Sequence, residues 1–178
     1  MLYIRHAQKA YVNGAVKEFP LDPELTECGR KTAQNRFREL ITLYGTPSRI
    51  ICSPYLRARE TAQIANDVVK DVTGNHLDIV CESQIGEFLG HHRGRDMNEC
   101  LRPETLVHSP IPPEQFKQYS ARIKKYVRSI GVPDFSNPIW VITHGIVIKS
   151  IAHFRGCDLD YPKELSGIRI DPYGINPV

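Results

Sequence analysis

The chain has 178 residues and a formal net charge of +3, and 41% of its residues are hydrophobic while 24% are charged. This balance is typical of a folded globular protein, and it excludes extensive disorder and the binding of free nucleic acid through bulk charge. The five cysteines are scattered and contain no Cys-x-x-Cys pair, so neither a disulfide framework nor a zinc site is expected.

The first residues and the apolar runs predict a cytoplasmic protein without a membrane partner. No apolar run approaches the ~18 residues that a membrane-spanning helix needs. The opening segment MLYIRH lacks the apolar stretch of a signal peptide, because a charge arrives at Arg5. The scattered cysteines fit a reducing compartment, and we expect them to be small core residues.

Several short segments have the composition of buried strands. They are rich in β-branched and other apolar residues, and turn signals bound them. These segments are LYI (2–4), RIIC (49–52), HLDIVCE (76–82), PIWVIT (138–143) and GIRI (167–170).

Apolar residues at helical spacing predict helices between these strands. We expect the second helix to begin with Ser53 as its N-cap and Pro54 at its first position. The expected helices run from after Thr26 to Gly45, from Ser53 to about Asp71, from Glu114 to Ile130, and through IVIKSIAHF (146–154).

The alternation of strands and helices predicts an α/β fold over residues 1–178, as one domain. We expect a three-layer sandwich in which helices flank a mostly parallel central sheet. Residues 83–113 form a long irregular stretch, and a stretch of this kind in a compact domain usually carries function.

Polar side chains of one chemical type follow three of the predicted strands. In a parallel α/β sheet, functional groups gather where strands end and helices begin. Histidines and arginines converging on one sheet edge would form a site for a dianion such as phosphate. The groups are Arg5-His6, Ser53 with Arg57 and Arg59, and Thr143-His144.

Five segments resemble the motifs of a known family, in that family's order. They are YIRHAQ (3–8), PLDPELTECGRKTAQ (20–34), ICSPYLRARETAQIA (51–65), GEF (86–88) and VITHG (141–145). The chain is similar to the histidine phosphatase superfamily, the phosphoglycerate-mutase-like enzymes. Ala7 stands where this family has glycine, and the extra methyl group is tolerated if the backbone does not need a positive φ.

The resemblance implies a metal-independent phosphatase that hydrolyses phosphate monoesters through a phosphohistidine on His6. It implies that Arg5, Arg59 and His144 surround the phosphoryl oxygens and stabilise the transferring group, with His144 also counted among the catalytic residues. Glu87 would act as general acid and base. Neither a metal nor a cofactor is implied.

Two arginines compete for the phosphate-binding position on the second helix. The family pattern places the binding residue directly before Glu-Thr-Ala, which selects Arg59. Arg57 is then expected on the surface or at the rim of the site. Ser53 is expected to serve only as a helix cap.

The segment GHHRGR (90–95) has two interpretations that the sequence leaves open. It is either a solvated basic loop or a substrate rim in which His92, Arg93 and Arg95 meet a second anionic group. The expected partner is a phosphorylated small molecule or a phosphopeptide, with nucleic acid expected only as a phosphorylated substrate. The oligomeric state is not predicted.

Two other functions compete with hydrolysis. A phosphoglycerate-type mutase would shield its phosphoenzyme from water, but the short interval between Glu87 and His144 and the short segment after GIRI favour a hydrolase. A catalytically weak pseudo-phosphatase would bind phosphorylated ligands without turnover. The competent residues at all core positions argue against this third interpretation.

Overall fold

The computed structural model describes residues 1–10, 22–88, 116–129 and 138–178. In this part of the chain a six-stranded sheet has the order β3-β2-β4-β1-β5-β6. The pairs β1–β4, β2–β4 and β2–β3 are parallel, while β1–β5 and β5–β6 are antiparallel. The strands are β1 (Leu2–Arg5), β2 (Arg49–Cys52), β3 (Ile79–Cys81), β4 (Ile139–Thr143), β5 (Gly167–Asp171) and β6 (Gly174–Pro177).

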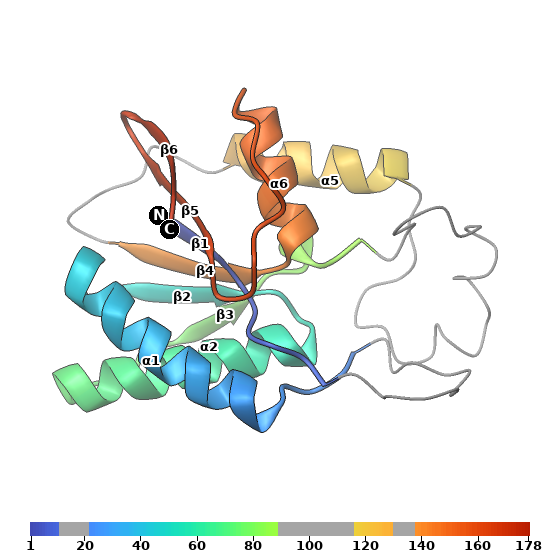
Figure 1. Ribbon diagram of the computed structural model, residues 1–178. Coiled ribbons are helices and arrows are strands. Elements are labelled where there is room, and N and C mark those ends of the chain that lie inside the picture. Colours follow the sequence, from blue (N-terminus) through green and yellow to red (C-terminus); the bar gives the residue numbers. More distant parts are fainter. Residues whose placement is uncertain (11–21, 89–115, 130–137) are drawn as a thin grey trace.

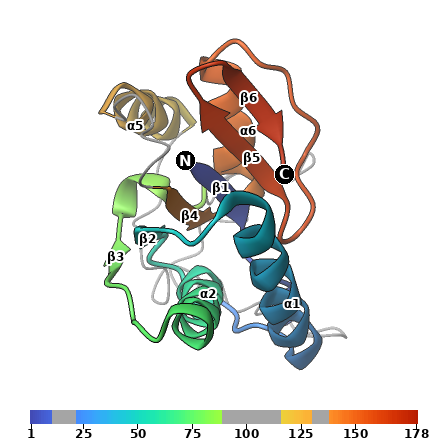
Figure 2. The same ribbon diagram turned by 90° about the vertical axis from the view of Figure 1, so that its left-hand side faces the viewer.

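Helices cover both faces of this sheet. Helices α1 and α2 lie on one face and α5 and α6 on the other (Figures 1 and 2). The predicted α/β sandwich with a mostly parallel sheet is therefore confirmed. The helices are α1 (Glu27–Tyr44), α2 (Leu56–Thr73), α5 (Phe116–Ser129) and α6 (Gly145–Phe154), and a 3-10 turn, η1, spans Ser83–Ile85.

The alternating side chains of the central strands supply a core on each side of the sheet. In β1, Leu2 and Ile4 belong to the cluster under α1 and α2, whereas Tyr3 belongs to the cluster under α5 and α6. On the first side, Phe37 of α1 stacks on Trp140 of β4 with 5.4 Å between ring centroids. Because both faces are buried, these strands read as continuous apolar runs in the sequence.

The structure differs from the sequence analysis in three details. The N-cap of α2 is Tyr55, and Ser53 lies before the helix because its side chain faces His144 instead. The antiparallel edge strand β6 was not predicted, since Gly174–Pro177 carries Gly, Pro and Asn. Cys52 is buried as expected, but Cys28 and Cys81 are exposed.

No helix in the described ranges is long and apolar enough to cross a bilayer. The expected compartment stays a prediction.

Candidate active site

The carboxyl ends of three parallel strands meet at one place. His6 follows β1, Ser53 follows β2 and His144 follows β4. Backbone hydrogen bonds fix this convergence, since the His6 N–H donates to the Thr143 carbonyl at 2.9 Å and the Ser53 N–H donates to the Ile142 carbonyl at 2.9 Å. The imidazole rings of His6 and His144 stand edge to face, with centroids 5.3 Å apart.

The His6 ring is held in one tautomer. Its Nδ1 lies 2.7 Å from the carbonyl oxygen of Ala7, and a carbonyl can only accept, so Nδ1 carries the proton. In the neutral ring Nε2 is then unprotonated, and it accepts a hydrogen bond from Arg57 Nε at 3.3 Å. Ala7 has no positive φ, so its methyl group causes no backbone strain.

The surroundings of His6 keep it neutral. Its side chain is only 2% exposed, and this burial lowers the pKa of His6 well below its usual value. The nearby His144 and Arg57 lower that pKa further, while Glu87 and the Ala7 carbonyl act in the opposite direction. A neutral imidazole with an available Nε2 is the form that can attack an electrophile.

Arg57 is the centre of the cluster, so its expected place at the surface or rim is wrong. Its side chain is 1% exposed, and its guanidinium donates to Glu87 Oε2 and lies 3.3 Å from Asp22 Oδ1. Arg57 Nη2 is also 3.4 Å from His144 Nδ1, and the guanidinium lies over the Tyr55 ring, 4.6 Å from its centroid.

Arg59, which the family pattern had selected, is exposed on α2. Residues two apart in a helix point about 200° from each other, so only one of the two arginines can face the sheet edge. The structure gives that position to Arg57. The assignment of phosphate binding to Arg59 is therefore corrected, and Arg57 is the candidate.

Glu87 lies two residues after η1, and its side chain is 16% exposed. Besides its contact with Arg57, its Oε2 is 3.5 Å from His144 Nδ1. Burial raises the pKa of Glu87, but Arg57, His6 and Lys9 outweigh it and leave that pKa below its usual value. Glu87 is thus a carboxylate while no substrate is present.

His144 is fully buried between the ends of two strands. Its Nε2 lies 2.7 Å from Ser53 Oγ, and the neighbouring Thr143 hydroxyl donates to the Ile85 carbonyl at 2.7 Å. Burial, and then the charges of Arg57, Lys9, Arg5 and Arg122, lower the pKa of His144 well below its usual value. Ser53 is therefore a site residue rather than the helix cap that the sequence predicted.

Arg5 is the last residue of β1 and directly precedes His6. Its Nη1 donates to the Pro162 carbonyl at 3.0 Å, and its guanidinium lies over the Tyr161 ring, 5.2 Å from the centroid. Its buried Nε–H has no hydrogen-bond partner among the described residues. A buried donor without a partner is costly, so this group is suited to a ligand oxygen.

Asp22 and Lys9 were missed by the sequence analysis. Asp22 accepts a hydrogen bond from the backbone N–H of Leu56 at 2.6 Å and faces Arg57, so it anchors that arginine at the start of α2. Lys9 is half-buried, and its charge acts on both Glu87 and His144. Both lie in or next to the segments that resemble family motifs, which was the available signal.

The remaining histidines and arginines that the sequence analysis considered lie either at exposed positions or outside the described ranges. His92, Arg93 and Arg95 are not among the residues that the structure describes, so both interpretations of the rim stay open. His76 and His153 are exposed. Among the described residues, no group of three or more His, Cys, Asp or Glu side chains could hold a metal ion.

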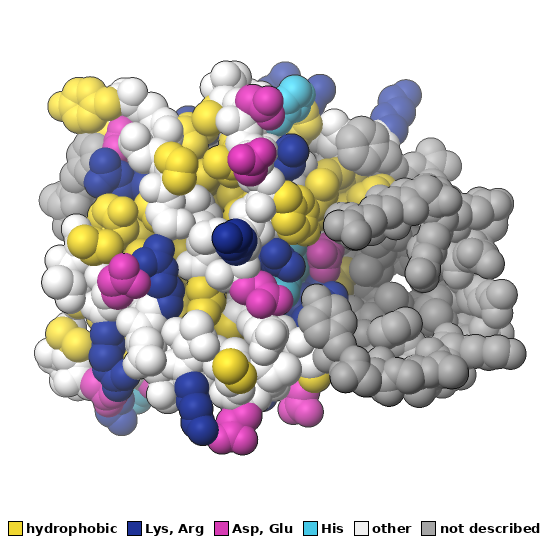
Figure 3. Space-filling view, viewed as in Figure 1, with side chains coloured by type: hydrophobic (Ala, Val, Ile, Leu, Met, Phe, Trp, Pro, Cys, Tyr) yellow, Lys and Arg dark blue, Asp and Glu magenta, His cyan; other side chains and the backbone are white. Residues whose placement is uncertain are grey.

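The cluster is chemically suited to a phosphate dianion. Arg5, Lys9 and Arg57 bring three cationic side chains to the cluster, where Asp22 and Glu87 pair with Arg57 and the charge of Glu164 acts on Lys9. On the face shown in Figure 3, side chains of Lys or Arg, of Asp or Glu, and of His lie close to one another. A preorganised set of donors around a neutral nucleophile can stabilise a transferring phosphoryl group.

The two buried histidines predict a pH-dependent stability. Their folded-state pKa values lie below the ordinary value of 6.5, so the unfolded chain takes up protons first as the pH falls. We expect the free energy of unfolding to be highest above pH 6.5 and to fall by about 1.4 kcal/mol per pH unit for each histidine below it. Urea denaturation between pH 7.5 and 5.5 measures this slope.

His6→Gln should roughly halve that slope, whereas substitution of the exposed His153 should leave it unchanged. The range ends at pH 5.5 because burial raises the pKa of Asp22, which acts in the opposite direction at lower pH. A constant free energy of unfolding across the range would contradict the burial argument.

Comparisons with known proteins place this geometry in context. The family model of the histidine phosphatase superfamily (branch 1) matches residues 1–174. A search of curated proteins finds no match.

Three solved structures share the fold at low sequence identity. The native mycobacterial glucosyl-3-phosphoglycerate phosphatase is 21% identical, with a TM-score of 0.62 over 94% of this chain and 87% of that one. The alpha-ribazole phosphatase from Shigella flexneri is 20% identical, with a TM-score of 0.64 over 99% and 93% of the two chains. A protein from Thermus thermophilus is 21% identical, with a TM-score of 0.62 over 98% and 95%.

Proposed function

Because the chain belongs to the histidine phosphatase superfamily, we propose that it hydrolyses phosphate monoesters through a phosphohistidine formed on His6. The observation that carries this proposal is the fixed tautomer of His6, whose unprotonated Nε2 accepts a hydrogen bond from the buried Arg57. An imidazole in this state is a competent nucleophile, and the guanidinium beside it can hold the group under attack.

Substrate binding begins with an exchange of partners at Arg57. In the free protein this arginine pairs with the carboxylates of Glu87 and Asp22. A phosphate dianion binds the guanidinium in place of Glu87 and also takes the unpaired Nε–H of Arg5. His144, held by Ser53, lies on the same side and contacts a further phosphoryl oxygen.

The same exchange prepares Glu87 to act as an acid. In the free protein the contact with Arg57 contributes to the low pKa of Glu87. Loss of that contact and the arrival of a dianion both raise the pKa, so Glu87 takes up a proton as the substrate binds. It then stands next to the oxygen that must leave as an alcohol.

Two chemical steps complete the reaction. Nε2 of His6 bonds to phosphorus while the bond from phosphorus to the ester oxygen breaks, and Glu87 gives its proton to that oxygen. Water then attacks the phosphohistidine and gives a proton to the Glu87 carboxylate. Phosphate leaves and His6 returns to its neutral form. The fixed cations supply the charge stabilisation that a metal ion supplies in other phosphoryl-transfer enzymes.

The substrate class is proposed more coarsely. The two named relatives are phosphatases of glucosyl-3-phosphoglycerate and of alpha-ribazole phosphate, both small phosphorylated molecules. We propose a phosphorylated small molecule for this chain as well. A phosphopeptide is the alternative. Because a peptide is larger than these molecules, it would need a wider opening to the active-site cluster.

Turnover of p-nitrophenyl phosphate in the presence of EDTA tests the proposal. We expect release of p-nitrophenol and phosphate at a rate that EDTA does not change, because the phosphoryl group is held by side-chain cations. No turnover by the wild-type protein, together with tight binding of phosphate, would favour the pseudo-phosphatase. Phosphoryl exchange between phosphoglycerates that is faster than phosphate release would favour the mutase.

A further inference from the structure

Helix α5 contacts the segment that carries Glu87, and Arg122 of this helix donates several hydrogen bonds to it. Arg122 Nη1 donates to the carbonyl oxygens of Gln84 at 2.5 Å, Gly86 at 3.1 Å and Ser83 at 3.3 Å. Its Nη2 donates to the Gly86 carbonyl at 3.1 Å. One guanidinium thus binds three of the four carbonyls that precede Glu87, those of Ser83, Gln84 and Gly86.

The residue after Glu87 is held by the same helix. The ring of Phe88 packs against Tyr119 of α5 with centroids 4.9 Å apart. The Tyr119 hydroxyl lies 3.0 Å from Ser150 Oγ of α6, the helix that begins directly after His144. The guanidinium of Arg122 itself lies over the Tyr119 ring, 5.2 Å from its centroid.

The segment has little regular structure of its own to fix it. Its 3-10 turn has long backbone hydrogen bonds, from the Ile85 N–H to the Glu82 carbonyl at 3.3 Å and from the Gly86 N–H to the Ser83 carbonyl at 3.1 Å. Gly86 then adopts an extended conformation. Charge-assisted hydrogen bonds from a planar guanidinium are stronger than neutral ones. Arg122 therefore adds a strong restraint to this backbone, beside the Thr143 hydroxyl that donates to the Ile85 carbonyl at 2.7 Å.

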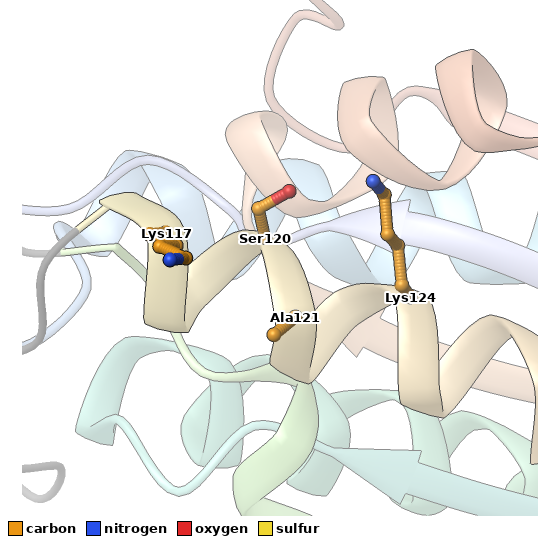
Figure 4. A pocket seen from close by; sticks show the side chains of 4 residues that line it. All are labelled: Lys117, Ser120, Ala121 and Lys124. Atoms are coloured by element: carbon orange, nitrogen blue, oxygen red, sulfur yellow. The ribbon is translucent and has the colours of Figure 1, made fainter.

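We propose that Arg122 is a positioning residue for the general acid: it fixes the backbone before Glu87 so that the carboxyl group meets the departing ester oxygen. This inference rests on the proposed phosphatase function. Arg122 does not line the cavity of about 420 Å³ on α5. That cavity is lined by Lys117, Ser120, Ala121 and Lys124 (Figure 4).

Dependence on the leaving group separates positioning from a general loss of structure. An alkyl phosphate releases a poor leaving group and needs a well-placed acid, whereas p-nitrophenyl phosphate releases a stable phenolate and needs little protonation. We expect Arg122→Met to lower kcat/KM for glycerol phosphate about 100-fold but kcat/KM for p-nitrophenyl phosphate less than about fivefold, because kcat/KM reports only the steps up to transfer of the phosphoryl group to His6.

The matched control is Arg128→Met, because Arg128 is exposed on the same helix. It should leave both rates unchanged. Arg122→Lys keeps a charged donor without the fork and should lose less than Arg122→Met on glycerol phosphate. It carries the same test if the methionine variant does not fold.

A cycle with Glu87→Gln gives the sharper test. If Arg122 acts through Glu87, adding Arg122→Met to Glu87→Gln should cost almost nothing further on glycerol phosphate. Equal losses on both substrates, or losses that multiply in the double variant, would overturn the inference. A wild-type protein that hydrolyses neither substrate would instead overturn the proposed function.

Discussion

Replacement of Arg57 by methionine is expected to lower kcat/KM for p-nitrophenyl phosphate about a thousandfold, the largest loss of any cation in the cluster. Arg57 touches His6, Glu87 and His144 together. Removing one preorganised donor from a transition-state oxygen typically costs 10²–10³ in rate, and Arg57 offers a two-pronged donor at a buried position.

Arg59→Met is the matched control for Arg57→Met. It removes the same group two residues away on the same helix, but from an exposed position. We expect its kcat/KM to stay within about twofold of the wild-type value. Steady-state rates, with circular dichroism to confirm folding, decide between the two arginines. A larger loss from Arg59→Met than from Arg57→Met would restore the assignment that the sequence suggested.

The two arginines also show where the sequence contained more information than the family pattern used. Residues four, seven and eleven positions after Arg57 share its side of α2, and these are Thr61, Ile64 and Val68, all buried. An arginine at the end of such a row faces the interior. The residues at the same spacings after Arg59 are polar: Gln63, Asn66 and Lys70.

The fold was predictable because its strongest signals are local. Apolar strands that are buried on both faces alternate with amphipathic helices, and this alternation specifies a layered α/β arrangement. The convergence of Arg5-His6 with Thr143-His144 followed from topology, since β1 and β4 are parallel neighbours. The edge strand β6 could not be predicted, because its stability comes from pairing with β5 rather than from its own composition.

The parts of the site that escaped prediction depend on side-chain direction in irregular segments. Ser53 reads as a helix cap because Ser-Pro is a common helix start, yet its hydroxyl contacts a histidine 91 positions away. Asp22 and Lys9 both lie in the connection from β1 to α1. Asp22 accepts from the N–H of Leu56 and Lys9 forms a β-bridge with Leu25, and no periodicity encodes contacts of this kind.

His6→Gln should abolish the chemical step, with a loss of at least about 10⁴ in kcat. Glutamine fills much of the same volume and can still donate to the Ala7 carbonyl, but it has no nitrogen lone pair that can bond to phosphorus. Because the position is buried, a water molecule cannot easily replace the missing imidazole as the nucleophile. We expect the variant to remain folded and to bind phosphate, because Arg5, Arg57 and His144 are intact.

Trapping of the intermediate gives the decisive measurement. When ³²P-labelled substrate is mixed with the wild-type protein and quenched in alkali, label should remain on the protein, and acid should release it, as a phosphoramidate bond requires. His6→Gln should retain no label, while His153→Gln, at an exposed position on α6, should be labelled like the wild type. Label on His6→Gln at the wild-type level would place the nucleophile elsewhere. Full turnover by wild type without any trapped label at early times would favour direct attack by water, with the neutral His6 ring acting as a base rather than as a nucleophile.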